Sequence, residues 1–249
     1  MAVIDVENIS FYYDAKKEFE IIKDISFTAS TGEFVSIVGP SGCGKSTLLR
    51  IMAGLIKPNG GRVLYMGKAI TEPIPELSFV FQDFALLPWL TNIENVKLGL
   101  SLSKMSDDRK DKRAIQLLDQ FGLSGFEESY PNVLSGGMRQ RVGVARAIAS
   151  DPKVLLMDEP FSSLDELTAN TLRNDIMEML REKSINVSCV IMVTHNVDEA
   201  VELSNKIVVL SDKPSKVNAI AKVDMKYPRD RYSKQFLTTV DKVFADLTK

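Results

Sequence analysis

Hydrophobic residues concentrate in four short runs along the chain, namely FVSIV at 34–38, VLLM at 154–157, VIMV at 190–193 and KIVVL at 206–210. A strand buried on both faces of a parallel sheet is apolar at successive positions in this way, although a buried helix gives the same pattern. Helical patterns separate the runs. The alternation of strand and helix predicts an α/β fold.

The first part of the chain has a different pattern. Residues 3–13 (VIDVENISFYY) and 60–70 (GGRVLYMGKAI) alternate between apolar and polar positions, as half-solvated strands do. We interpret Gly60-Gly61 as a turn signal. An antiparallel β subdomain is therefore expected beside the main sheet.

Residues 84–150 contain little strand signal. Within them one apolar helix face has the spacing i, i+3, i+4 and i+7, with Asp107 as the expected N-cap and Gly122 as the expected stop. Its members are Ala114, Leu117, Leu118 and Phe121. We expect a single domain in which an α-helical subdomain at 84–150 is inserted into an α/β core made of 1–83 and 151–249.

The stretch GPSGCGKST at 39–47 follows the first buried run and precedes a predicted helix at about 45–53. Its spacing, Gly39-x-x-x-x-Gly44-Lys45-Ser46, is that of a phosphate-binding P-loop. Glycines allow several backbone N–H groups to converge on a phosphate chain, and the helix directs its positive end toward the anion. The alternative is a glycine turn that happens to contain a lysine.

The P-loop pattern assigns a role to each of its polar residues. Lys45 would neutralise the β- and γ-phosphates, and the Ser46 hydroxyl would join the Mg²⁺ shell. The nucleotide-binding residues expected here are Gly39, Pro40, Ser41, Gly42, Cys43, Gly44, Lys45, Ser46 and Thr47.

The segment VLLMDEP places Asp158 and Glu159 directly after a buried run. Asp158 is positioned to hold Mg²⁺, and Glu159 is positioned to polarise a water molecule as a general base. An ordinary cap or turn is the alternative for this pair, and the accompanying P-loop favours the functional interpretation.

The segment LSGGMRQ at 134–140 precedes a helix whose apolar face contains Met138, Val142, Ala145 and Ala149. Ser135 is expected to cap this helix, and Gly136 and Gly137 leave its N-terminus open to an anion. The chain thus has two phosphate-binding helix ends but only one Lys-bearing loop.

These motifs together resemble those of the ABC ATPase family, over nearly the whole chain. The resemblance implies a P-loop NTPase (RecA-like) core, ATP hydrolysis with Mg²⁺, and a homodimer that closes head-to-tail on two ATP molecules. Each ATP then lies between one P-loop and the partner's Ser135, Gly136 and Gly137.

The resemblance also implies roles for single residues elsewhere. Gln82 is similar to the glutamine that contacts Mg²⁺ and water, and Asp165 lies in the loop that crosses the dimer interface. His195, the only histidine, resembles the one that contacts the γ-phosphate. Tyr13 is similar to the aromatic that stacks on adenine, although Phe11 and Tyr12 are adjacent. The expected catalytic residues are Glu159, His195, Gln82 and Lys45, and the expected metal ligands are Ser46, Gln82 and Asp158.

The composition and the two cysteines bear on possible partners, membrane spans and disulfides. The formal net charge of -2 gives no basic footprint for nucleic acid, and no apolar stretch approaches the roughly 20 residues that cross a bilayer. Cys43 and Cys189 are far apart in the sequence, which does not indicate a disulfide framework. Cys43, inside the P-loop, is expected to make the site sensitive to thiol reagents.

The segment FQDFALLPWLTNIENVKLGL at 81–100 resembles importer ATPases of the nitrate/sulfonate/taurine type, as do Pro73, Pro75 and the tail at 228–240. This implies a peripheral subunit at the cytoplasmic face of the membrane. It would drive separate integral membrane permeases, and indirectly an extracellular or periplasmic solute-binding protein. Pro88-Trp89 is expected to be an exposed anchor for a partner helix, or otherwise a partly buried loop aromatic.

Other functions stay open at this point. They are an exporter-type ATPase, a non-transport ABC ATPase acting on nucleic acid or the ribosome, and a nucleotide-regulated binding module without turnover. The tail carries apolar residues at helical spacing, which predicts a terminal helix packed on the core, or otherwise a regulatory or dimer contact. These residues are Phe236, Val240, Val243, Phe244 and Leu247.

Overall fold

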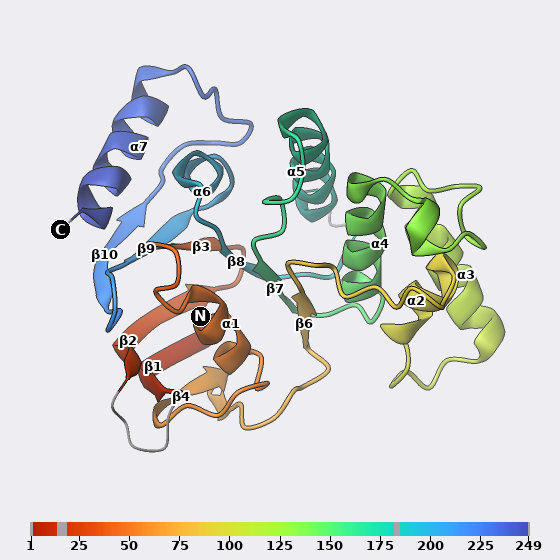
Figure 1. Ribbon diagram of the computed structural model, residues 1–249, viewed down its shortest axis with the longest axis horizontal. Coiled ribbons are helices and arrows are strands. Elements are labelled where there is room, and N and C mark those ends of the chain that lie inside the picture. Colours follow the sequence, from red (N-terminus) through yellow and green to blue (C-terminus); the bar gives the residue numbers. More distant parts are fainter. Residues whose placement is uncertain (1, 14–18, 182–184, 249) are drawn as a thin grey trace. The chain divides into compact units, whose positions relative to one another are not determined.

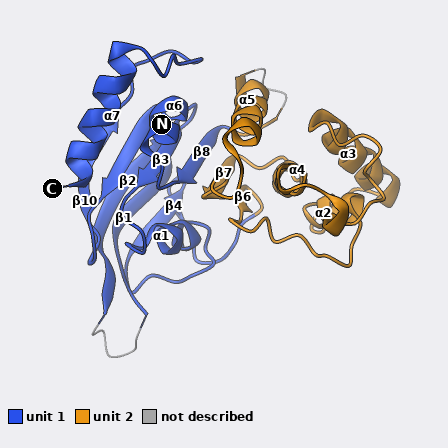
Figure 2. Ribbon diagram, turned by 45° about the horizontal axis from the view of Figure 1, so that its top comes forward, with its two compact units in different colours: residues 1–74, 188–249 blue, residues 75–187 orange. Residues whose placement is uncertain are grey.

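The computed structural model describes residues 2–13, 19–181 and 185–248. Its backbone contacts divide the chain into two compact units (Figure 2). Unit 1 comprises Met1–Ile74 and Ser188–Lys249, and unit 2 comprises Pro75–Val187.

An antiparallel sheet in the order β2-β1-β4-β5 forms the first layer of unit 1 (Figure 1). Its strands are β1 (Ala2–Tyr12), β2 (Glu20–Ser30), β4 (Gly60–Tyr65) and β5 (Lys68–Ala69). Buried residues alternate with more exposed ones along most of β1 and β2, as the polar/apolar alternation predicts for a sheet with one solvated face. The predicted antiparallel subdomain is therefore confirmed.

The turn signal at Gly60-Gly61 was misplaced. Both glycines lie inside β4, and the turn to β5 is made by Met66 and Gly67, at φ 48° and φ 79°. Gly61 has φ 77°, and β4 lies so close to Glu7 and Asn8 that a Cβ on Gly61 would collide with their carbonyl oxygens. This glycine thus permits a close strand approach rather than a chain reversal.

The apolar runs of unit 1 form strands β3 (Phe34–Val38), β8 (Cys189–Val193) and β9 (Lys206–Leu210), with β3 paired in parallel to both others. The edge strand β10 (Val217–Lys222) pairs antiparallel to β9. Strands β3 and β8 are buried throughout. Two carboxyl ends of parallel strands, at Val38 and Val193, therefore lie at one edge, and the loops that follow them begin there.

In the described part of unit 1 the helices are α1 (Lys45–Met52), α6 (Val197–Leu203) and α7 (Lys234–Leu247). The predicted terminal helix is α7, and it packs against β9, β10 and α6 through Phe236, Val240 and Val243. Leu247 is partly buried in the same cluster. Phe244, expected on this face, is instead 49% exposed, because it lies one position beyond the buried stripe.

Unit 2 contains the parallel pair β6 (Leu77–Val80) and β7 (Val154–Asp158). Its helices are α2 (Asn92–Leu98), α3 (Asp107–Gln120), the 3₁₀ turn η1 (Pro131–Val133), α4 (Gly136–Ile148) and α5 (Glu166–Arg181). All of residues 84–150 are described, and they hold helices and turns but no strand. The boundaries of a helical subdomain at 84–150 remain a prediction, since unit 2 also includes β6, β7 and α5.

The predicted apolar face of α3 is confirmed, and all four of its residues are at most 1% exposed. The N-cap is Ser106 rather than Asp107, which is the first residue of the helix, where a carboxylate favours the positive helix end. Gly122 has φ 66° just beyond the C-cap, as expected of a stop.

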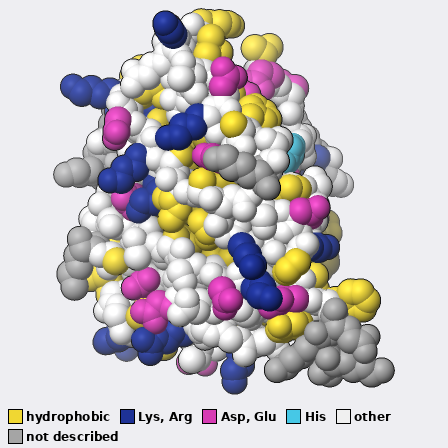
Figure 3. Space-filling model, turned by 90° about the vertical axis from the view of Figure 1, so that its left-hand side faces the viewer, with side chains coloured by type: hydrophobic (Ala, Val, Ile, Leu, Met, Phe, Trp, Pro, Cys, Tyr) yellow, Lys and Arg dark blue, Asp and Glu magenta, His cyan; other side chains and the backbone are white. Residues whose placement is uncertain are grey.

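No helix in the described part of the chain is long and apolar enough to cross a membrane. On the face drawn in Figure 3, basic and acidic side chains are interspersed, in line with the formal net charge of -2.

Candidate functional site

The loop between β3 and α1 has the backbone conformation that a phosphate-binding loop requires. Gly42 and Gly44 have φ 76° and φ 108°, and Gly44 is the N-cap of α1. A Cβ on Gly44 would come within 2.8 Å of Cγ2 of Ile21. Glycine is needed here both for the positive φ and for the lack of space, and α1 begins at the next residue.

Lys45 is folded back over its own loop. Its Nζ donates to the carbonyl oxygens of Gly39 and Pro40, at 2.9 Å each, and its side chain is 5% exposed. These carbonyl contacts hold a positive charge at the N-terminus of α1, where the helix dipole already favours an anion.

Cys43 differs from the expectation of a reactive thiol. The residue is fully buried, and burial raises the pKa of its thiol. The Ser215 hydroxyl donates to the Cys43 carbonyl oxygen across 2.6 Å, which anchors the loop to the segment before β10. Thiol sensitivity through Cys43 is thus the wrong expectation, since reactivity needs an accessible thiolate.

The three adjacent aromatics near the start of the chain occupy different environments. Phe11 is buried, and the Tyr12 hydroxyl donates to Glu20 across 2.8 Å, which raises the pKa of Tyr12. Tyr13 is 64% exposed, with its hydroxyl 2.6 Å from that of the P-loop residue Thr47. Of the three, Tyr13 is the one presented beside the P-loop.

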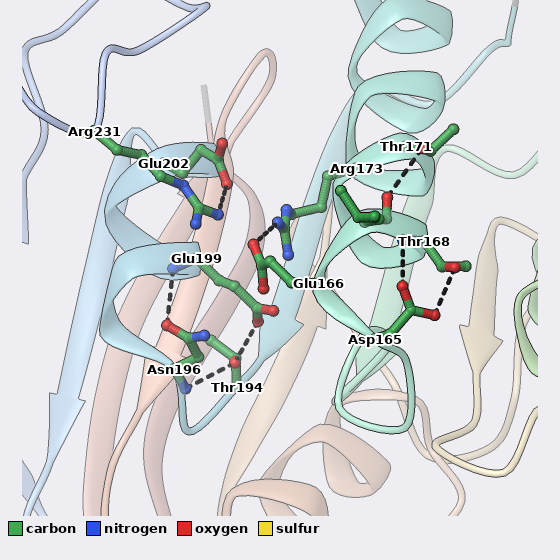
Figure 4. A network of polar contacts seen from close by, with 11 residues as sticks. Asp165, Glu166, Thr168, Thr171, Arg173, Thr194, Asn196, Glu199, Glu202 and Arg231 are labelled. Carbon is green, nitrogen blue, oxygen red and sulfur yellow. Dashed lines mark hydrogen bonds and ion pairs between the residues drawn. The ribbon is translucent and has the colours of Figure 1, made fainter.

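His195 follows β8, and a closed set of hydrogen bonds fixes the backbone on both sides of it. The Thr194 hydroxyl donates to Oε2 of Glu199 (2.8 Å) and accepts from the Asn196 N–H (3.0 Å). Oδ1 of Asn196 in turn accepts from the Glu199 N–H (3.2 Å), which caps α6 (Figure 4). Thr194 and Glu199 are buried while His195 is exposed. The imidazole therefore projects from a rigid turn.

In unit 2, Asp158 and Glu159 lie at the carboxyl end of β7. Asp158 is 2% exposed. Glu159 has φ 46°, a left-handed conformation that costs about 1–3 kcal/mol in a non-glycine residue. The N–H and hydroxyl of Ser162 donate to the Glu159 carbonyl oxygen, at 3.3 and 3.0 Å. Strained backbone of this kind is concentrated at functional sites.

The segment LSGGMRQ begins α4 as predicted. The Ser135 side chain caps the helix by accepting from the Met138 N–H across 3.3 Å. The space beside Gly137 is filled by the methyl group of Thr168, so that a Cβ at Gly137 would collide with it. Ser135 is exposed, Gly136 half-buried and Gly137 buried.

Asp165 lies just before α5 and binds Thr168 through both carboxylate oxygens. Oδ1 accepts from the Thr168 N–H (3.0 Å) and Oδ2 from the Thr168 hydroxyl (2.7 Å). The hydroxyl, followed by the N–H, lowers the pKa of Asp165. The carboxylate is therefore ionised and immobilised at the surface.

Gln82 is exposed in the loop after β6, and the loop residues that follow are held from two sides. Phe84 and Ala85 have φ 58° and φ 45°, and the Arg146 guanidinium on α4 donates to both of their carbonyl oxygens. Burial lowers the pKa of Arg146.

The second side of this loop is held by Asn95 on α2. Its buried amide accepts from the Leu87 N–H (2.8 Å) and donates to the carbonyl oxygens of Leu87, Leu90 and Thr91. Trp89, between these anchors, is 68% exposed. The expected exposure of Pro88-Trp89 is confirmed.

The structure thus groups the predicted residues within each unit. In unit 1 the P-loop and His195 follow the neighbouring parallel strands β3 and β8. Tyr13 follows β1 of the antiparallel sheet and meets the P-loop at Thr47. In unit 2 the segment LSGGMRQ at 134–140, called the signature segment from here on, and Asp165 meet through Thr168. Thr168, Glu199, Arg146 and Asn95 were not predicted. An isolated Thr, Glu, Arg or Asn on a helix has no distinctive pattern, and only the i, i+3 spacing of Asp165 and Thr168 was a usable signal, as an N-cap.

Comparison with known proteins shows which family the chain resembles over its length. A model of the ABC transporter family matches residues 22–162. An uncharacterized ABC transporter ATP-binding protein of Methanocaldococcus jannaschii is 42% identical over 235 residues, which cover 94% of this chain and 87% of that protein. An aliphatic sulfonates import ATP-binding protein, SsuB, of Bacillus cereus is 40% identical over 234 residues, which cover 94% and 91%.

Solved structures of ATP-binding cassettes have the same fold as this chain. The ATP-binding cassette MJ0796, determined as a dimer in a post-hydrolysis state bound to ADP and Pi, superimposes with a TM-score of 0.78. The sequence identity is 32%, and the match covers 90% of this chain and 100% of that one.

The fold and its loops are those of a P-loop NTPase, as predicted. The chain belongs to the ABC transporter ATP-binding family, and ATP binding and hydrolysis are the activities characteristic of this family.

Proposed function

We propose that this ATPase powers the import of a small solute, of the nitrate, sulfonate or taurine kind, through separate integral membrane subunits. It would do so as a peripheral subunit at the cytoplasmic face of the membrane, with a solute-binding protein acting indirectly. The likeness to the sulfonate import protein supports this direction and class. The observation that carries the docking role is Trp89, exposed on a loop whose backbone Arg146 and Asn95 hold.

In the proposed site, residues of the P-loop bind the phosphates of ATP. Backbone N–H groups around Gly42 and Gly44 cradle the β-phosphate, and Lys45 exchanges its two carbonyl contacts for phosphate oxygens. Tyr13 stacks on adenine, for which its exposure beside Thr47 is suited.

Mg²⁺ fits the donor set proposed for it. Ser46, Gln82 and Asp158 offer a hydroxyl, an amide and a carboxylate oxygen, the hard ligands that Mg²⁺ takes together with phosphate oxygens. When bound, Mg²⁺ neutralises negative charge on the phosphates.

Hydrolysis is assigned to Glu159 and His195. The strained backbone of Glu159 fixes the direction of a carboxylate that would orient and deprotonate the attacking water. His195, on its braced turn, would contact the γ-phosphate. Positioning and charge stabilisation account for most of the rate in phosphoryl transfer.

Two copies of the chain are proposed to close on ATP. Ser135, Gly136 and Gly137 of one copy would contact the γ-phosphate bound to the P-loop of the other, with Asp165 at the contact between them. The capped helix end at Ser135 provides N–H groups for that anion. The dimeric state of the ATP-binding cassette MJ0796 supports this arrangement.

The import role is tested by purifying tagged Glu159→Gln protein from its own cells, in detergent with ATP and Mg²⁺, and identifying its partners by mass spectrometry. A co-purified polytopic permease whose operon also encodes a solute-binding protein is the expected result. Adding Trp89→Ala should reduce permease recovery roughly tenfold while ATP binding is retained. Tyr232→Ala is the matched control, since Tyr232 is 91% exposed on unit 1.

Other recovered partners would point to other functions. A permease without a solute-binding protein would favour an exporter-type ATPase. Ribosomal or DNA-bound proteins without a permease would overturn the transport role and leave the ATPase assignment standing.

A further inference from the structure

One side chain, Thr168, serves two segments that the proposed function places at the dimer contact. Its hydroxyl donates to Oδ2 of Asp165 across 2.7 Å (Figure 4). Its methyl group occupies the position that a Cβ on Gly137 would need, whereas its own Cβ lies 3.7 Å from that position. The two branches of a single threonine thus face the first turn of α4 and the residue that precedes α5.

Two contacts constrain the χ1 angle of Thr168: the hydrogen bond of its hydroxyl to Asp165 and the packing of its methyl group at Gly137. Rotation about Cα–Cβ would break the hydrogen bond to Asp165 if the methyl moved away from Gly137. A β-branched side chain has few rotamers on a helix, so a partial adjustment is not available. A displacement of α4 at Gly137 is therefore transmitted to Asp165 through the side chain itself.

Other contacts near the start of α4, and between α4 and α5, do not link Gly137 to Asp165 in this way. Leu164 leaves 3.8 Å to a Cβ built on Gly136, which is ordinary van der Waals space. Arg141 and Asp175 form an ion pair of 2.9 Å between α4 and α5, further along both helices. Leu164 precedes Asp165 in the chain but leaves room for a Cβ on Gly136, and the ion pair joins the two helices away from Asp165.

We propose that Thr168 is a positioning residue that makes the N-terminus of α4 and the loop at Asp165 move as one body. The proposal rests on the proposed function for its consequence, which is that contact of Ser135–Gly137 with a nucleotide also positions Asp165 at the dimer contact. ATP recognition by the signature segment and engagement of the Asp165 loop then become one event.

The link is tested first without any activity measurement, through the pKa of Asp165 in the full-length protein. Selective ¹³C labelling of aspartate carboxyl groups follows the titration by NMR, with Asp165→Asn to assign the signal. Thr168→Val removes the hydroxyl, so the pKa should rise toward the ordinary aspartate value of about 3.9. Thr168→Ser keeps the hydroxyl and should leave it nearly unchanged.

The decisive variant is Gly137→Ala, which introduces no charge. Its Cβ forces Thr168 to rotate, so the pKa of Asp165 should rise as in Thr168→Val. Thr168→Ser in the same chain removes the colliding methyl and should restore the low value. An unchanged pKa in Gly137→Ala, or no restoration in the double variant, would overturn the proposal.

Thr171→Val is the matched control on the same helix. The Thr171 hydroxyl donates to the Leu167 carbonyl oxygen across 3.0 Å, a bond within α5 (Figure 4). A general loosening of α5 would move the Asp165 signal in this variant too, and would count against a specific role of Thr168.

The functional consequence is measured separately, as ATP-dependent dimerisation in the Glu159→Gln background. Thr168→Val should weaken dimerisation roughly tenfold, the loss of one hydrogen bond to a charged group, while ATP affinity of the monomer is kept. If no variant dimerises on ATP, the proposed function fails, and the titration of Asp165 still decides the link. Wild-type dimerisation of Thr168→Val would limit Thr168 to a structural contact.

Discussion

Oγ1 of Thr194 lies 2.8 Å from Oε2 of Glu199, and both residues are buried on either side of the exposed His195 turn. A charge-assisted hydrogen bond in a buried position is stronger than a neutral one at the surface. The pair closes the turn that carries His195 at the start of α6. The turn that carries His195 is thereby held by two buried side chains.

Glu199→Gln is expected to lower kcat for ATP hydrolysis roughly tenfold with KM little changed, because the weaker bond loosens the His195 turn after ATP is bound. Steady-state kinetics over a range of ATP concentrations measure the two constants. Asp198→Asn, on the neighbouring position of α6, is the control and should retain wild-type kinetics. A rise in KM at unchanged kcat would show that Glu199 affects binding instead.

Glu159 combines a proposed catalytic carboxylate with a left-handed backbone at φ 46°. Glu159→Ala loses the carboxylate and keeps the strain, whereas Glu159→Gly loses both. The glycine variant should therefore exceed the alanine variant in free energy of unfolding by about 1 kcal/mol, while both lack turnover.

Urea unfolding followed by circular dichroism compares the two variants, and Glu159→Gln provides a strained reference of wild-type shape. An alanine variant as stable as the glycine variant would mean that the loop relaxes its backbone once the side chain is gone.

The sequence carried more information about strands and phosphate loops than about the contacts that hold them. The four apolar runs and the Gly39–Ser46 spacing were sufficient because burial and backbone freedom leave local patterns. Phe244 and Gly60-Gly61 were misjudged because the width of a buried helix stripe and the partner of a strand glycine depend on distant residues.

Side chains that bind backbone carbonyl groups were beyond prediction. The Arg229 guanidinium donates to the carbonyl oxygens of Val201, Glu202 and Ser204 at the end of α6. Its partners are backbone carbonyl oxygens, which every residue has, so no pattern of opposite charges in the sequence indicates the contact. Arg146 and Asn95 escaped prediction for the same reason.

Arg146→Ala is expected to destabilise unit 2, because two charge-assisted bonds to Phe84 and Ala85 are lost while both residues keep positive φ. The free energy of unfolding should fall by about 2 kcal/mol or more. Urea denaturation measures it, with Arg109→Ala on the exposed part of α3 as the control. A loss no larger than in the control would mean that the loop holds its shape without Arg146.

The two cysteines should resist thiol reagents in the folded protein. Burial raises the pKa of the Cys43 thiol, and burial above all, followed by the Glu33 charge, raises that of Cys189 to about 12. At pH 8 both thiols are therefore protonated as well as inaccessible, and modification by a chromogenic disulfide should proceed only at the rate of unfolding. Addition of urea above the unfolding midpoint should release both at once.

The same shifts give a pH dependence of stability with a defined sign. Because the folded state holds the thiol protons more tightly than the unfolded state, the stabilisation is complete below the unfolded pKa of about 9 and is lost as pH rises from there toward 12. Cys189→Ala, followed by urea unfolding between pH 7 and pH 10.5, should flatten the alkaline decline. An equal decline in Cys189→Ala and the wild-type protein would assign it to other groups.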